Sequence, residues 1–296
     1  MKMVELAAGG EACTEIDRQY SPSLLVGSLQ NYLDDYARKS AIARKLPSCR
    51  VGLRYGSSDS EKLDFWLGPN RHSPLVVFVH GGNWAALDES DSAFLAQPLQ
   101  QYGYAFAALG YGLAPAKNIE EMVQMVRRAV FWLKAQATAL NFDPGKVVLV
   151  GTSAGAHLAA MATAYDSLAA PNLGLRRLVL LSGIYDLNRV LSSYVNSFLK
   201  LDMSRAFANS PVNHIGPHFP STTIARGGIE TDEYVWHHNA MRESLRKGGV
   251  AVREIVEPNR NHFDLPYDLA KPGTALYNEL QFSSPDNRSR RIGSEQ

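Results

Sequence analysis

The sequence has 296 residues, of which 45% are hydrophobic and 20% are charged, and its formal net charge is +1 at pH 7. This length and apolar content suffice for one large core, and α/β folds of this size are often a single domain. A nearly balanced charge without long runs of one sign gives no basis for nucleic-acid binding, which needs a basic surplus against the phosphate backbone.

Signals for secretion and membrane insertion are also missing from the sequence. The N-terminal residues lack the apolar core of about 7–15 residues that a signal peptide carries, and no stretch approaches the roughly 18 apolar residues of a membrane span. Two cysteines, Cys13 and Cys49, are too few for a disulfide framework in a chain of this length. We therefore expect a soluble cytoplasmic protein with reduced thiols, and the sequence leaves its oligomeric state open.

Predicted strands and helices alternate along most of the chain. After a frayed segment over residues 1–15, helical spacing extends over 16–45 and is interrupted near Pro47. Buried strands are predicted over 75–79, 104–109, 147–150, 178–181, 222–226 and 250–256, and helices over 119–140, 155–165 and 232–247. Continuous apolar strands that alternate with helices favour a mostly parallel sheet covered on both faces.

Two segments depart from this alternation. Residues 186–220 have mixed polarity and prolines at 211, 217 and 220, which predicts a cap-like insertion over one end of the sheet. Residues 283–296 form a polar tail that we expect to be disordered. The remaining residues, 1–282, are expected to form one domain.

Residues 151–155 read Gly-Thr-Ser-Ala-Gly, a G-x-S-x-G motif between a predicted strand and a predicted helix. In hydrolases with this motif the serine is the nucleophile, and small neighbours let the strained turn close and the substrate approach. The N-terminus of the following helix directs free N–H groups at developing negative charge. We predict that Ser153 is a nucleophile; the alternative is an ordinary glycine-rich turn.

A second glycine motif, His80-Gly81-Gly82, follows the predicted strand at 75–79. The tetrahedral intermediate of acyl transfer needs backbone donors already aimed at its oxygen, each of which is worth roughly 3–4 kcal/mol in the barrier. Adjacent glycines let the backbone come close. We predict an oxyanion hole made by the N–H groups of Gly81, Gly82 and Ala154, and we expect His80 to hold the loop by hydrogen bonds.

A histidine base is expected after the last strand, because the chain order in this fold is nucleophile, acid, histidine. His262 follows the strand predicted at 250–256 after a short loop and is predicted to be the general base. His157 lies in the helix after the nucleophile and is expected to be a packing or surface residue, and His237 and His238 lie in the middle of another predicted helix.

Three carboxylates follow the strand at 222–226 and compete for the role of triad acid. Gly227-Gly228 marks the predicted end of that strand, so that Glu230 lies in the turn, where it can hold the imidazole. Thr231 or Asp232 is a plausible helix cap, and Glu233 falls in the first helical turn. Glu230 is favoured, and Asp232 and Glu233 stay open as alternatives.

These residues identify a resemblance to the kynurenine formamidase (arylformamidase) branch of the α/β-hydrolases, near the hormone-sensitive-lipase-like esterases. The resemblance covers roughly residues 16–265 and is carried by IDRQYSPS, HGGNW, YGLAP, GTSAGAHLA, SGIYDL, GGIETDEYVWHH and NHFDL. It implies an α/β-hydrolase fold and, aligned on Glu233-Tyr234, it places the family's acid on Glu230. The chain departs from the family at His237, where many members carry glutamine, and at Gly110, where many related esterases carry aspartate.

The sequence thus predicts an enzyme, a serine hydrolase with a small-molecule substrate. The resemblance implies an arylformamidase-like amidase for a small aromatic N-formyl substrate, with Trp84 and Tyr185 as candidates to stack on the leaving group or, equally, as packing residues. A carboxylesterase, lactonase or thioesterase, for example of secondary metabolism, would share every catalytic residue. A non-catalytic binding protein on this scaffold would usually have lost the serine or histidine. We expect no cofactor and no metal, because the histidines lack ligand spacing, and neither nucleic-acid nor membrane partners.

Overall fold

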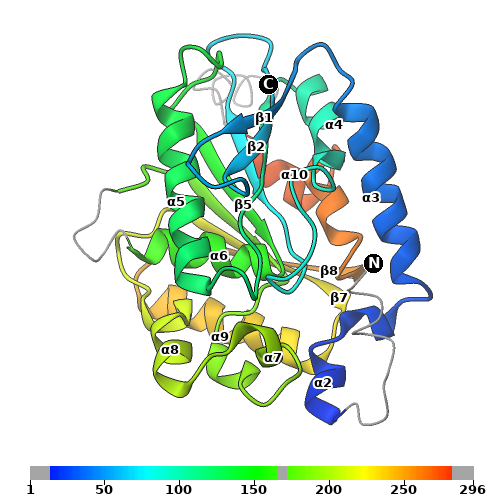
Figure 1. Ribbon diagram of the computed structural model, residues 1–296, viewed down its shortest axis with the longest axis vertical. Helices are drawn as coiled ribbons and strands as arrows, with labels where there is room; N and C mark the ends of the chain where they lie inside the picture. Colours follow the sequence, from blue (N-terminus) through cyan, green and yellow to red (C-terminus); the bar gives the residue numbers. More distant parts are fainter. Residues whose placement is uncertain (1–13, 166–171, 282–296) are drawn as a thin grey trace, which may run out of the picture.

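The structure is a computed structural model that describes residues 14–165 and 172–281. An eight-stranded sheet runs through the molecule in the order β1-β2-β4-β3-β5-β6-β7-β8 (Figure 1). Its strands are β1 (Cys49–Arg54), β2 (Lys62–Trp66), β3 (Leu75–Val79), β4 (Ala105–Leu109), β5 (Val147–Thr152), β6 (Arg177–Leu181), β7 (Thr222–Ile229) and β8 (Val252–Asn261). The β1–β2 and β2–β4 pairs are antiparallel, and the other neighbours are parallel.

The predicted mostly parallel α/β sheet is confirmed, and β3 covers the range predicted for it. The two antiparallel strands at one edge, β1 and β2, were missed. In β1 every residue is exposed or half-buried, so it lacks the continuous apolar run of the central strands. An edge strand with little burial leaves no such signal in the sequence.

Side chains of the central strands alternate between two hydrophobic layers. In β3, Val77 and Val79 belong to one layer and Val76 and Phe78 to the other. The first layer includes α5 (Ile119–Ala135), α6 (Ala154–Ala164) and α9 (Asp232–Lys247), and the second includes α3 (Leu29–Ala43), α4 (Ala96–Gln101) and α10 (Ala275–Leu280). Helices therefore cover both faces, as continuous apolar strands require.

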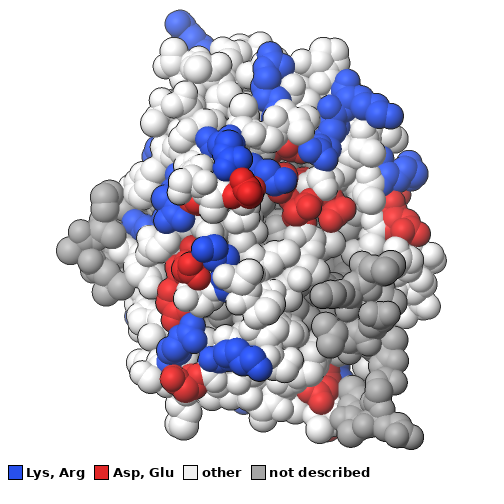
Figure 2. Space-filling view, viewed as in Figure 1, with Lys and Arg blue, Asp and Glu red and all other residues white. Residues whose placement is uncertain are grey.

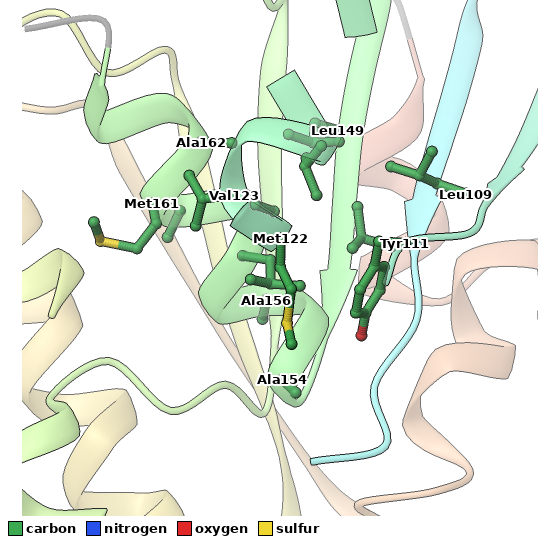
Figure 3. Close-up of a cluster of buried hydrophobic side chains, with 14 of the residues drawn as sticks. Leu109, Tyr111, Met122, Val123, Leu149, Ala154, Ala156, Met161 and Ala162 are labelled. Carbon is green, nitrogen blue, oxygen red and sulfur yellow. The ribbon is translucent and has the colours of Figure 1, made fainter. Parts of the chain in front are cut away.

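Helices α5 and α6 pack together against the middle of the sheet. In Figure 3, Met122 of α5 lies near Ala156 of α6 and Val123 of α5 lies near Met161, in the cluster that also includes Leu149 of β5. Every residue of α6 is buried, and small side chains let this helix approach the strands closely. Helix α5 begins at a capping box of Asn118 and ends five residues before the predicted boundary.

The N-terminal region forms several separate elements instead of the single helical segment that its apolar spacing predicted. It forms α2 (Glu15–Gln19), a 3₁₀ turn η1 (Pro22–Leu25) and α3, because Pro22 begins a new turn after α2. Residues 1–13 and the tail predicted over 283–296 lie outside the described residues.

The segment predicted as an insertion contains only short elements, η4 (Leu187–Val190), α7 (Asn196–Leu199), α8 (Met203–Ala208) and η5 (Pro211–Asn213). It meets the N-terminal region, since the Tyr194 N–H donates to Asp17 Oδ1 at 2.6 Å and the Tyr194 hydroxyl donates to the Tyr20 carbonyl at 3.2 Å. The insertion and the N-terminal region are therefore in direct contact.

The surface carries no broad patch of one charge on the face drawn in Figure 2, where basic and acidic side chains are interspersed. In the described part of the chain, no helix is both long and apolar enough to cross a membrane.

Close packing of α6 on the sheet gives a prediction about stability. A Cβ added at Gly155 would lie 2.1 Å from the carbonyl oxygen of Val79, whereas a Cβ at exposed Gly27 would meet nothing within 4 Å. We expect Gly155→Ala to lower the free energy of unfolding by about 1–3 kcal/mol, because the helix must move away from β3. Gly27→Ala is the control, with a change below about 0.5 kcal/mol. Equal urea midpoints for the two variants would contradict this packing argument.

Candidate active site

Ser153 lies on the turn between β5 and α6, where the backbone takes an unusual conformation. Its φ is +55° and its ψ is −123°, a region that non-glycine residues rarely occupy. The Ser153 N–H donates to the Leu181 carbonyl at 2.8 Å, which fastens the turn to β6. Such strain at a predicted nucleophile is typical of a functional turn, because the surrounding structure must hold it.

The two-glycine loop after β3 packs directly against this turn. A Cβ on Gly81 would lie 3.0 Å from the Ser153 Cβ, and Gly82 has a φ of +100°. His80 donates from Nδ1 to the Gly81 carbonyl at 2.8 Å and stacks on Tyr111, whose hydroxyl donates to the His80 carbonyl at 2.9 Å. Burial lowers the pKa of His80 to about 4, so its ring is neutral and holds the loop, as expected.

The backbone donors predicted for the oxyanion hole are available. Within the described part of the chain, the N–H groups of Gly82 and Ala154 donate to no protein acceptor. Ala154 is the first residue of α6, where the helix leaves its N–H groups unsatisfied. Gly81 and Gly82 line the same pocket as Ser153, and Ala154 directly follows Ser153.

The loop after β8 holds His262 through local hydrogen bonds. Asn261 Oδ1 accepts from the Phe263 N–H at 2.9 Å, and Asp264 Oδ1 accepts from the Asn261 N–H at 2.7 Å. The hydroxyl of Tyr36 donates to the Phe263 carbonyl. The sequence Asn-His-Phe-Asp therefore makes its own turn, and α3 secures it from outside.

Glu230 is the carboxylate that meets His262. Its Oε2 lies 3.0 Å from His262 Nδ1, its Oε1 accepts from the Ser182 hydroxyl at 2.5 Å, and its side chain is fully buried. Asp232 is exposed, and Glu233 pairs instead with Arg189. Of the three carboxylates left open by the sequence, only Glu230 is in contact with His262.

The reason given for that choice was partly wrong. Strand β7 continues past the glycines to Ile229 instead of ending at them. A Cβ on Gly227 would lie 2.3 Å from the Arg260 carbonyl oxygen, and one on Gly228 would lie 2.4 Å from the Pro258 carbonyl oxygen. The glycines thus let β8 approach β7 closely, which brings the His262 loop to Glu230.

One pocket, with a volume of about 110 Å³, collects these residues. Ser153 and His262, only 7% and 6% exposed, lie on its floor with the glycine loop. Most of the remaining wall comes from the N-terminal region and the insertion: Tyr20, Ser21, Pro22, Ser23, Leu29, Leu33, Tyr36, Tyr194 and Phe198. The wall is largely aromatic and aliphatic.

Comparisons with known proteins agree with this arrangement. A family model described as BD-FAE matches residues 63–242. The chain is 34% identical to a kynurenine formamidase of Danio rerio over 85% of this chain and 89% of the relative. It is also 37% identical to a kynurenine formamidase of Salmo salar over 67% of this chain and 69% of the relative. The chain belongs to the kynurenine formamidase-like branch of the α/β-hydrolases.

Solved structures extend the comparison. A protein from Silicibacter sp. TM1040, provisionally assigned as a thioesterase, superposes with a TM-score of 0.79 at 29% identity, over 90% of this chain and 98% of the other. Esterase B from Lactobacillus rhamnosis superposes with a TM-score of 0.66 at 17% identity, over 85% of this chain and 92% of the other, and shows the shared fold. The protein is therefore a hydrolase of amidase or esterase type.

The two aromatic residues expected to stack on the substrate do not line the pocket of this hydrolase. Trp84 and Tyr185 are fully buried. The Trp84 indole N–H donates to His157 Nδ1 at 3.3 Å, and His157 Nε2 donates to the Asn209 carbonyl at 2.7 Å. Both aromatic residues are packing residues, the alternative that the sequence also allowed.

His237, one departure from the family pattern, holds part of the pocket wall. Its Nδ1 accepts from the Tyr185 N–H at 3.3 Å, so its Nε2 donates to the Tyr20 hydroxyl at 2.9 Å. Tyr20 in turn donates to Glu233 at 3.4 Å, and Glu233 pairs with Arg189. Burial lowers the pKa of His237 to about 3, with the Arg189 charge acting in the same direction. The neutral ring therefore ties the N-terminal wall to α9.

Several residues of the site were missed as site residues in the sequence, among them Ser182, Tyr20 and Tyr234. Ser182 directly follows β6, and the carboxyl ends of β6 and β7 meet at one edge, which could have identified it as a neighbour of Glu230. Tyr234 lies in the first turn of the helix that begins just after Glu230, a position that could have placed it near His262. Tyr20 carries no comparable signal, because its role depends on how the N-terminal region folds back.

The buried neutral histidines predict a loss of stability in acid. The folded-state pKa is about 4 for His80 and His157 and about 3 for His237, against about 6.5 in the unfolded chain. The unfolded chain therefore binds more protons below pH 6.5, and the free energy of unfolding should fall as the pH drops from about 6.5 towards 4.

His237→Gln should reduce that slope by about 1.4 kcal/mol per pH unit near pH 5, because one protonation is removed. Glutamine can keep both hydrogen bonds of the ring, one accepted from Tyr185 and one donated to Tyr20. Urea unfolding at several pH values measures the slope. An unchanged slope would show that His237 does not stay neutral in the folded protein.

Proposed function

We propose that this hydrolase is an arylformamidase-like amidase in which Ser153 is the nucleophile, His262 the general base and Glu230 the acid that orients it. One observation carries the proposal: His262 is hydrogen-bonded to the buried Glu230 and shares a pocket with Ser153 on its positive-φ turn. The Ser182 hydroxyl donates a hydrogen bond to the second carboxylate oxygen of Glu230. This contact fixes the position from which the carboxylate faces the His262 ring.

The first half-reaction forms a formyl-enzyme. His262 Nε2 takes the proton of Ser153 Oγ as this oxygen attacks the formyl carbon. Negative charge then develops on the former carbonyl oxygen, where the N–H groups of Gly81, Gly82 and Ala154 would stabilise it. The C–N bond breaks as His262 returns its proton to the leaving aryl amine. Glu230 stays ionised throughout and supports the imidazolium.

The second half-reaction releases formate. A water molecule replaces the amine, and His262 takes its proton as the water oxygen attacks the formyl carbon. The ester bond to Ser153 Oγ then breaks as His262 returns the proton to Ser153 Oγ. A formyl group needs little room beside the nucleophile, so the largely apolar wall is left for the aryl group. The two kynurenine formamidases at 34% and 37% identity support this choice of substrate.

An esterase or thioesterase is the second candidate, and the superposition with the Silicibacter protein, provisionally a thioesterase, favours it. The same residues would perform that reaction, since only the leaving atom differs. Initial rates with N-formyl aryl amines, p-nitrophenyl acetate and an acyl thioester separate the two candidates. The formamide is expected to give the highest kcat/KM, and its failure to react would leave the esterase candidate.

Removal of the nucleophile is the direct test of the mechanism. Ser153→Ala should lower kcat by about 10⁴–10⁶-fold while the melting temperature stays close to that of the wild type. A serine-directed phosphonate should label the wild type on the peptide that contains Ser153, as mass spectrometry would detect. A variant that retains a tenth of the activity would rule out Ser153 as the nucleophile.

A paired substitution tests the acid. Glu230→Gln should lower kcat by about 10³–10⁴-fold, because the ring loses the carboxylate that supports its charged form. Asp232→Asn is the matched control at an exposed position in the same segment and should leave kcat near the wild-type value. Steady-state kinetics compares the two. The reverse result would transfer the role to Asp232.

A further inference from the structure

The hydroxyl of Tyr234 is a buried polar group with no hydrogen-bond partner among the described residues. Tyr234 lies in the first turn of α9 and is 1% exposed, and it lines the pocket together with Ser153 and His262. Among the described residues, none forms a hydrogen bond with its Oη. A buried hydroxyl that lacks a partner costs free energy, so native proteins nearly always pair such groups.

The other tyrosines of the pocket wall have engaged hydroxyls. The Tyr20 hydroxyl is bound by His237 and Glu233, the Tyr36 hydroxyl donates to Phe263, and the Tyr194 hydroxyl accepts from Asn83 Nδ2 at 3.1 Å. A phenylalanine at position 234 would fill the same space without the cost of the unpaired group. The hydroxyl of Tyr234 is therefore free for a partner that enters the pocket.

The position of Tyr234 indicates which part of a substrate it faces. Its ring meets the His262 ring edge-on, with centroids 4.6 Å apart and an interplanar angle of 66°. The N–H groups proposed as oxyanion donors come from other elements than Tyr234, namely the glycine loop and the start of α6. His262 delivers its proton to the leaving group, so a side chain packed against His262 lies on the leaving-group side.

The chemistry of the hydroxyl is that of a donor. Burial raises the pKa of Tyr234 well above its usual value, and the charges of Tyr194 and Glu230 add to the effect; the nearby Ser153 hydroxyl, which does not meet hydrogen-bond geometry with the Tyr234 hydroxyl, lowers it. The phenol thus stays protonated at neutral pH and can donate one hydrogen bond. Its natural partner is a neutral acceptor such as a carbonyl oxygen.

The rest of the pocket favours a leaving group without charge. Of the described residues that line it, none is an aspartate, glutamate, lysine or arginine. Leu29, Leu33 and Phe198 contribute apolar surface instead. A charged substituent would lose its hydration there and gain no ionic partner, which is unfavourable.

We propose that Tyr234 binds the leaving group, donating a hydrogen bond to a neutral acceptor beside the scissile bond, and that the pocket selects aromatic leaving groups that carry such an acceptor but no charge. This inference deepens the proposed function and rests on it for the formamide substrates. It makes Tyr234 a residue that determines specificity.

The test compares two enzymes with two substrates. Formanilide and 2-formamidoacetophenone share the formamide, and only the second carries a carbonyl next to it. We expect the wild type to favour 2-formamidoacetophenone in kcat/KM, and Tyr234→Phe to reduce that preference by about 3- to 10-fold, as expected for one neutral hydrogen bond. An unchanged preference in Tyr234→Phe would overturn the assignment, because a role in packing or on Ser153 alone would affect both substrates equally.

A matched variant removes a hydroxyl elsewhere. The Tyr104 hydroxyl donates to the Leu280 carbonyl at 2.9 Å, and Tyr104 does not line the pocket. Tyr104→Phe should keep the substrate preference and lower the melting temperature, because Leu280 loses its donor. Tyr234→Phe should instead keep or raise the melting temperature, because no bond within the protein is lost. A clear drop in the melting temperature of Tyr234→Phe would show that the hydroxyl has a structural role, which would contradict the proposal.

Two further measurements separate this inference from the proposed function. N-formylkynurenine adds an amino-acid group with two charges to the same aryl ketone, and we expect its kcat/KM to be lower than that of 2-formamidoacetophenone; a higher value would overturn the selection against charge. If no formamide reacts, the proposed function fails, and phenyl acetate with 2-acetylphenyl acetate tests Tyr234 in the same way. If Tyr234→Phe loses the preference for 2-acetylphenyl acetate over phenyl acetate, the role of Tyr234 in leaving-group binding is supported. If that preference is unchanged, Tyr234 does not have this role.

Discussion

Parallel pairing of β3, β5, β6, β7 and β8 is the constraint on which the candidate site depends. Parallel strands end at one edge of the sheet, so the segments that follow them meet there even though they lie far apart in sequence. Ser153 follows β5, Ser182 follows β6, Glu230 follows β7 and His262 follows β8. The Ser182–Glu230–His262 hydrogen bonds thus connect three successive strand ends in the order of the sheet. The register of the parallel strands places these four residues next to one another, and the short loops after the strands orient their side chains.

Much of this could be predicted because the central strands are buried on both faces and have continuous apolar sequences. Once these strands were predicted, the position of each glycine motif directly after a strand was enough to interpret it. The strands β1 and β2, in contrast, were missed. Strand β1 is exposed at the edge of the sheet, and the short β2, although buried, has no continuous apolar run because it contains Lys62 and Asp64. Glu230 is the carboxylate that contacts His262, but the glycines from which it was chosen serve the approach of β8 to β7. Local sequence cannot reveal such an approach between two strands.

The pocket wall was the least predictable part, for a physical reason. Trp84 and Tyr185 were plausible ligands because aromatic residues near a nucleophile often contact substrate, but both are fully buried. The wall comes instead from Tyr20 and its neighbours in the N-terminal region and from Tyr194 in the insertion. These segments are joined by contacts such as the one between Asp17 and Tyr194, which span more than 170 residues. No periodicity within either segment encodes that contact.

The two departures from the family pattern have local structural explanations. A Cβ on Gly110 would lie 2.3 Å from Glu89 Oε2, so the buried Glu89, paired with Lys62 at 3.0 Å, already supplies a carboxylate where an aspartate at position 110 would place one. His237 makes one accepted and one donated hydrogen bond, which a glutamine amide could also make. Each substitution therefore preserves the local polar contacts, and neither touches Ser153, His262 or Glu230. The floor of the pocket is built from strand ends, whereas its wall comes from the N-terminal region, the insertion and α9. The pocket wall held by His237 can therefore change while the reaction class stays constant.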